Sequence, residues 1–210
     1  MGFIHKKNDK IIKYFDNILM IKNDLKNILS KQFFVGFTYL IFGLFLVLKK
    51  ISPIYLLFCL AFMQFYSYFI HVLFHTIPYI REVHLIHHEK KIISKKLDLL
   101  FETILNFCFF GILYFIQELT GIKIIPTKII IYAGLVYTSS HIINYSILNV
   151  NDIHEKHHLK EDGIYKYNFG PNIVDYVMGT NYHNDCEDLR HMYPNIILSY
   201  FFTELISRFF

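Results

Sequence analysis

Long apolar runs alternate with short polar connections along most of the chain. The runs cover residues 33–48, 54–75, 99–116 and 129–148. A helix that crosses the hydrocarbon core of a bilayer needs roughly 20 mostly apolar residues, so each run is a candidate span. Lys49-Lys50 and Ser52-Pro53 separate the first two runs, and Gly121 and Pro126 separate the last two. The pattern predicts an all-α integral membrane protein built as a four-helix bundle.

The segments outside these runs are amphipathic or polar. Residues 8–31 place apolar side chains at helical spacing between Lys and Asp, which indicates a helix on the membrane surface or a solvated helix packed on the protein. We therefore divide the chain into a basic N-terminal segment, 1–31, and a membrane-embedded domain, 32–210. Residues 76–98 and 149–210 are expected to form a helical cap that carries the metal site. The tail ends in an apolar stripe, Phe201 to Phe210, that indicates core packing or contact with the membrane surface.

Composition and charge agree with a multi-pass membrane protein. Hydrophobic residues make up 54% of the chain, and the mean hydropathy is +0.35. The net charge of +4 is too small to indicate nucleic-acid binding. Of the 21 Lys and Arg residues, 17 fall on the side of the predicted cap, which therefore faces the cytoplasm, at the endoplasmic reticulum membrane if the source is eukaryotic. Cys59, Cys108 and Cys186 form no paired motif and are expected to be free thiols.

Histidines gather where two of the apolar runs end. His71 and His75 are four residues apart, as are His84 and His88, so each pair projects from one face of a helix. Neutral imidazole is the side chain best suited to iron, zinc or copper. The full candidate ligand set is His71, His75, His84, His87, His88, His141, His154, His157 and His158. Nine imidazoles are too many for one metal ion and sufficient for two.

The order and spacing of these motifs resemble the fatty acid hydroxylase and sterol desaturase superfamily of membrane-bound oxygenases. The resemblance covers His71 to Thr180 and includes the Asn168-Phe169-Gly170 segment and the later Asp175 and Gly179-Thr180. It departs from the family pattern in three places. Leu99-Leu100-Phe101-Glu102 replaces a His-Pro-x-Glu segment, Tyr145 stands where some members have a further His, and Val174 and Met178 replace aromatic residues.

The resemblance implies a non-haem di-iron centre that uses O2 to hydroxylate or desaturate a fatty acyl, sphingolipid or sterol substrate. Zinc would be a substitute for iron in purified material. Electrons would come from a separate donor such as cytochrome b5 or a ferredoxin. An all-imidazole ligand set needs hydrogen-bond acceptors that orient the rings. The candidates for that role are Asn144, Asp152, Glu155, Asn168 and Asp175.

Two other functions remain open from the sequence. His154, Glu155 and His158 also form an HExxH pattern, the signature of a zinc metalloprotease, although this would leave the earlier histidines unexplained. Alternatively, the protein is a non-catalytic carrier of metal or haem. His183, Cys186 and His191 lie outside the resemblance and match no recognised ligand spacing.

Overall fold

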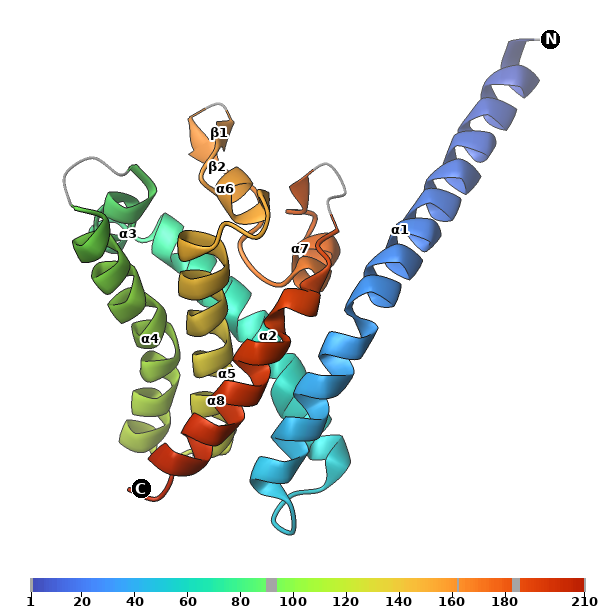
Figure 1. Cartoon of the computed structure of the whole chain (residues 1–210). Helices are drawn as coiled ribbons and strands as arrows, with labels where there is room; N and C mark the ends of the chain where they lie inside the picture. The colour runs from blue at the N-terminus through green and yellow to red at the C-terminus, as the bar shows by residue number, and fades with distance from the viewer. Residues whose placement is uncertain (1, 90–93, 162, 183–185, 210) are drawn as a thin grey trace.

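The chain folds into helices with one hairpin of two short strands (Figure 1). The computed structural model describes residues 2–89, 94–161, 163–182 and 186–209, and it describes no side chain of residues 2–20, 87 and 89. The elements are α1 (Gly2–Val47), α2 (Pro53–Thr76), α3 (Ile80–Glu89), α4 (Lys95–Thr120), α5 (Thr127–Ser139), the π-helix η1 (Ser140–Ile147), α6 (Ile153–His157), β1 (Lys160–Glu161), β2 (Ile164–Tyr165), α7 (Asn172–Met178), the 3-10 helix η3 (Leu189–Met192) and α8 (Tyr193–Ile206).

The long helices pack side by side. Helix α4 contacts α5, α5 contacts α8, and α8 contacts α1. Within the described ranges, three helices are long and apolar enough to cross a membrane: Ile21–Val47, Pro53–Thr76 and Lys95–Thr120. The fourth predicted span, 129–148, is divided between α5 and η1, which follow each other directly. The nearly all-α fold with several candidate membrane helices confirms the coarse prediction.

The N-terminal segment and the first span are one helix instead of two separate elements. Helix α1 runs without a break from Gly2 to Val47, and its N-terminal half extends away from the other helices (Figure 1). Neither glycine nor proline occurs between residues 3 and 35, so nothing in the local sequence stops the helix. The change from polar to apolar residues near position 31 marks a change of surroundings and not a change of backbone conformation.

The ends of the other long helices have local causes. Ser52 caps α2 by accepting a hydrogen bond from the backbone N–H of Tyr55 at 3.2 Å, and Pro53 occupies the first helical position. Pro78 ends α2 because the residue before it, Ile77, is held in an extended conformation. Gly121 ends α4 in the left-handed conformation, with φ 71°.

Helices α3, α6 and α7 and the strand pair gather at one end of the long helices (Figure 1). The turn between α1 and α2 and the C-terminus lie at the opposite end. The last part of the predicted cap therefore differs from the expectation, since α8 runs back along the bundle. Its buried face is Asn195, Ile196, Ser199 and Thr203, whereas Phe201 and Phe202 of the apolar stripe are exposed. Phe201 and Phe202 are thus free to contact lipid and are not part of the core.

Candidate metal centre

Five buried imidazoles from three helices converge at the end of the bundle that bears α3 and α6. One ring nitrogen from each of the five lies within 4.8 Å of those of all the others. The Nε2 atom of His84 is 3.2 Å from that of His71 and 3.1 Å from that of His75. We call this set the five-histidine group: His71, His75, His84, His88 and His157.

Helical spacing explains how the sequence builds this group. His71 and His75 stand one turn apart on the last turns of α2, and His84 and His88 stand one turn apart on α3. The turn at Ile77-Pro78 brings α3 back against α2, so that the two pairs face each other. His157 joins them from α6, with its Nε2 atom 3.2 Å from that of His75.

Backbone carbonyl groups orient two of these rings. The Nδ1 atom of His71 lies 2.6 Å from the carbonyl oxygen of Phe169, and the Nδ1 atom of His157 lies 2.7 Å from that of Tyr167. When Nδ1–H donates to a carbonyl, the lone pair of Nε2 is left for a metal. Burial lowers the pKa of His157 well below its ordinary value, and the neighbouring imidazoles lower it further. The same two causes lower the pKa of His88. Both rings are therefore neutral, as ligands must be.

The segment 168–180 supports those carbonyl groups. Asp175 is fully buried and accepts hydrogen bonds from the backbone N–H groups of Phe169 (2.9 Å) and Gly170 (3.0 Å) and from the hydroxyl of Thr180 (2.7 Å). Burial raises the pKa of the Asp175 carboxyl to about 7, although the three donors lower it. A Cβ atom at Gly170 would lie 3.0 Å from the Cβ of Tyr68 on α2, so only glycine allows this close approach. Asn168 adopts φ 54° and accepts from the N–H of Tyr182 at 3.1 Å.

A carboxylate and two imidazoles form a second candidate site. Glu102 on α4, His141 on η1 and His154 on α6 each offer a ligand atom within 4.8 Å of the others. Glu102 is only 2% exposed, and its Oε1 atom lies 3.1 Å from Nε2 of His141 and accepts a 2.8 Å hydrogen bond from the Ser146 hydroxyl. We call Glu102, His141 and His154 the mixed group. Glu102 is thus a further ligand candidate beside the predicted imidazoles.

The π-helix η1 carries His141 of the mixed group. Its wider i→i+5 hydrogen bonding continues to the N–H of Leu148, which donates to the carbonyl of Ile143 at 2.9 Å. Such π-helical turns are rare and often occur at functional sites. His141 and Tyr145 both project from this segment, and the ring of Tyr145 stacks on His154 with centroids 5.5 Å apart. Some family members have a further histidine at the position of Tyr145. In this chain the tyrosine ring at that position is an aromatic neighbour of the mixed group.

His158 lies between the two groups. Its Nε2 atom is 3.1 Å from that of His154, and its ring stacks on His88 with centroids 4.1 Å apart. Of the nine predicted ligands, five are therefore in the five-histidine group, two are in the mixed group and His158 connects them. The side chain of His87 lies outside the described residues, so its predicted role stays a prediction.

The predicted orienting residues divide into two sets. Asn168 and Asp175 belong to the segment that holds the Tyr167 and Phe169 carbonyls. Asp152 and Glu155 are exposed, and Asp152 pairs with Lys156 at 3.1 Å. Their predicted orienting role stays a prediction. The backbone carbonyls of Phe169 and Tyr167, which do orient imidazole rings, cannot be recognised from the sequence.

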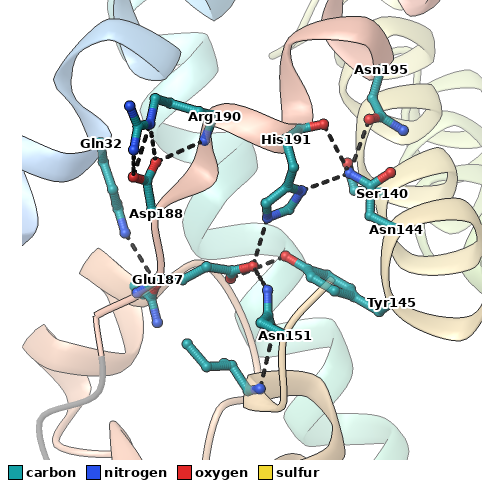
Figure 2. Close-up of polar contacts among 12 residues, drawn as sticks. Gln32, Ser140, Asn144, Tyr145, Asn151, Glu187, Asp188, Arg190, His191 and Asn195 are labelled. Atoms are coloured by element: carbon teal, nitrogen blue, oxygen red, sulfur yellow. Dashed lines mark hydrogen bonds and ion pairs between the residues drawn. The ribbon is translucent and has the colours of Figure 1, made fainter. Parts of the chain in front are cut away.

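Asn144 belongs to a different polar network, which Figure 2 shows. Its Nδ2 atom donates to His191 Nδ1 at 2.7 Å and to the Asn195 side chain at 3.0 Å. His191 Nε2 in turn lies 2.8 Å from the buried carboxylate of Glu187, which also accepts from the hydroxyl of Tyr145 at 3.1 Å. His191 thus faces a carboxylate, and it does not face Cys186 or a metal group. His183 lies outside the described residues.

An elongated cavity of about 600 Å³ reaches both groups. His71 of the five-histidine group and His141 and His154 of the mixed group line one end. Its walls are mostly apolar side chains of α1, α2 and α5, among them Leu40, Leu60 and Val136. Along α2 the lining extends from Leu57 to His71, which is about 21 Å at 1.5 Å per residue. This volume is in the usual range for sites that hold small organic ligands.

Groups of mostly buried imidazoles that open on an apolar cavity between membrane-type helices are typical of a membrane protein with a metal-binding centre. Comparison with protein families matches residues 56–180 to the family described as fatty acid hydroxylase. The match covers more than half of the chain, and the chain therefore belongs to the fatty acid hydroxylase family. The match includes both ligand groups and the segment 168–180. Neither the curated proteins nor the solved structures gave a match.

Proposed function

We propose that this protein is an O2-dependent lipid hydroxylase or desaturase that oxidises a C–H bond of a fatty acyl, sphingolipid or sterol substrate. The observation that carries the proposal is the shared end of the cavity, where His71, His141 and His154 face an apolar space of about 600 Å³. A long apolar substrate could lie in this space with one carbon beside both ligand groups. Membership of the family supports the same reaction class.

The residues of both groups fit two metal ions, which we propose to be iron. The five-histidine group and the mixed group, with His158 between them and His87 as a further ligand, would hold the pair. Bound iron would supply the redox chemistry that activates O2 with electrons from an external donor. Imidazole ligands suit iron, zinc and copper alike, so zinc is the expected substitute in purified protein. A separate protein such as cytochrome b5 or a ferredoxin is the proposed electron donor.

The chain itself has three tasks in this mechanism. Apolar side chains of α1, α2 and α5 bind the lipid and exclude water from the reacting carbon. The carbonyls of Phe169 and Tyr167 hold two imidazoles in the orientation that leaves Nε2 free for metal. Glu102 adds a negative charge to the mixed group, which an all-imidazole set would lack.

For the membrane arrangement we propose four spans at 33–48, 54–75, 99–116 and 129–148. The cap at 76–98 and 149–210, without the returning helix α8, would lie on the cytoplasmic side, at the endoplasmic reticulum if the source is eukaryotic. The excess of Lys and Arg on that side supports this orientation. The exposed phenylalanines of α1 and α8, such as Phe33 and Phe201, would face lipid.

The test compares His157→Ala with Glu155→Gln in cells, followed by lipid mass spectrometry. His157 is 1% exposed at the centre of the five-histidine group, and its loss should abolish the oxidised lipid and reduce bound metal. Glu155 is exposed, and its change should leave product unchanged. A zinc protease would lose activity in Glu155→Gln, and a carrier would move metal without consuming O2. An unchanged lipid profile in His157→Ala would contradict the proposal.

A further inference from the structure

A polar side chain lies in the wall of the apolar cavity, far from the metal groups. Gln64 is half-buried, lines the cavity, and occupies the middle of α2, a candidate membrane-spanning helix. Among the described residues, its side-chain amide has no hydrogen-bond partner; only its backbone carbonyl accepts, from the hydroxyl of Ser67 at 2.8 Å. An unpaired amide in an apolar environment is destabilising, so we expect a bound ligand to supply its hydrogen-bond partner.

Two other polar side chains of the cavity, Gln32 and Ser67, already have partners. Gln32, the other glutamine of the cavity, donates to the Asn172 side chain at 3.1 Å. Ser67, one turn from Gln64 on α2, is satisfied by the helix backbone. Gln64 therefore differs from Gln32 and Ser67 in having donors and an acceptor available to a ligand.

The exposed Gly36 on α1 leaves open space at the level of Gln64. Gly36 also lines the cavity, and a Cβ atom there would meet nothing within 4 Å. Helices α1 and α2 are joined by the short turn at 48–52, and Gly36 and Gln64 each lie eleven residues from the turn end of their helix. The two residues are therefore at the same depth, about 16 Å from the turn. The unpaired side-chain amide of Gln64 and the open space at Gly36 therefore lie at the same depth in the bundle.

The cavity also opens to the side at this part of the bundle. Phe37 on α1 and Leu57 on α2 line it, and each is 53% exposed on the outer surface. In a bilayer that surface would contact lipid, so a substrate could enter between α1 and α2 without passing through water.

We propose that Gln64 recognises a hydrogen-bonding oxygen, a hydroxyl or carbonyl, within the apolar body of the lipid substrate. This inference rests on the proposed function, because it places the oxidised carbon at the histidine end. Gln64 precedes His71 by seven residues, two turns on the same face of α2, which is about 10 Å along the helix. The preferred lipid therefore carries an oxygen roughly 10 Å from the carbon that is oxidised. A hydroxylated acyl chain and a sterol both supply this chemistry.

The test measures lipid binding to the metal-free protein in detergent by displacement of a fluorescent fatty acid. The probes are stearic acid, stearic acid with a mid-chain hydroxyl or keto group, and cholesterol. The wild type should bind at least one of the hydroxy acid, the keto acid and cholesterol more tightly than stearic acid, whose only oxygens are in its carboxyl group. Gln64→Met, which keeps length and removes the amide, should weaken that binding roughly tenfold and leave stearic acid unchanged. The probe that responds identifies the source of the oxygen.

Gln32→Met is the matched control, since it makes the same change in the same cavity at an amide that is already bonded. It should not alter the preference between probes. Equal binding of all probes by wild type and Gln64→Met would overturn the inference. Thermal unfolding of each variant checks that it folds. Binding is measured without metal, so this test does not depend on oxidation. If the protein shows the Gln64-dependent preference but never oxidises a lipid, only the proposed function is contradicted.

Discussion

The two ligand groups differ in charge, in origin and in access to the cavity. The five-histidine group is built from imidazoles alone, and four of its five members come from α2 and α3, which are adjacent in sequence. The mixed group takes one residue from each of α4, η1 and α6, and one of them is a carboxylate. Only His71 of the first group reaches the cavity, whereas both imidazoles of the second do. Under the proposed function, we therefore expect the first group mainly to retain metal and the second to face the substrate.

The largest expected effect comes from His84→Ala in the five-histidine group. Its Nε2 atom is within 3.2 Å of three other imidazoles, those of His71, His75 and His88. Removing a central ligand should cost more than the 10- to 100-fold typical of an outer residue, so we expect at least about 100-fold loss of turnover. Metal content by mass spectrometry should fall with it. Glu82→Ala changes an exposed residue of the same helix and should have no effect. Full metal content in His84→Ala would contradict the role of this group.

Glu102→Gln should have the next largest effect and should act on the mixed group alone. The change keeps size and removes the charge that faces His141 at 3.1 Å. We expect turnover to fall on the order of 10- to 100-fold and bound metal to fall toward half. Glu118→Gln is the matched control on the same helix, because Glu118 is exposed and pairs with Lys123. If Glu102→Gln retained both metals and full turnover, the distinction between the groups would be lost.

The sequence predicted the five-histidine group more completely than the mixed group for a physical reason. The first depends on helical spacing within α2 and α3, which the positions of His71, His75, His84 and His88 reveal directly. The second depends on the packing of α4 against η1, which no local pattern encodes. The single signal for Glu102 was its place in the reduced His-Pro-x-Glu segment, and that signal did not distinguish a ligand from an orienting residue.

Backbone features were the other part that sequence could not supply. The carbonyls of Tyr167 and Phe169 orient imidazoles, yet any residue has a carbonyl, so only the folded structure reveals their contacts with His157 and His71. The π-helical turn at η1 likewise has no characteristic amino-acid composition by which the sequence could predict it. The continuous helix α1 was divided in the prediction because a change in polarity was interpreted as an element boundary.

Asp175→Asn should weaken the five-histidine group more than the mixed group. The carboxylate accepts hydrogen bonds from the backbone N–H groups of Phe169 and Gly170 and from the Thr180 hydroxyl, and an amide cannot accept all three in the same geometry. We expect roughly a tenfold loss of metal affinity, measured by competition with a chelator. Asp188→Asn changes an exposed aspartate and serves as the control. Equal loss of metal from both groups would indicate general unfolding instead of an effect through the His71 ring.

Tyr145→Phe should have the smallest effect, because it separates two contributions of one side chain to the mixed group. It removes the hydroxyl that donates to Glu187 at 3.1 Å (Figure 2). It keeps the ring that stacks on His154. One hydrogen bond is worth about 1 kcal/mol, so we expect a small loss of thermal stability and less than about fivefold loss of turnover. Tyr145→Leu also removes the ring and should cost more, since His154 then loses its stacked neighbour. Tyr79→Phe, at a residue that is 82% exposed, is the control for loss of a hydroxyl alone. If Tyr145→Phe were as damaging as Tyr145→Leu, the Glu187 network and not the aromatic contact would determine the position of His154.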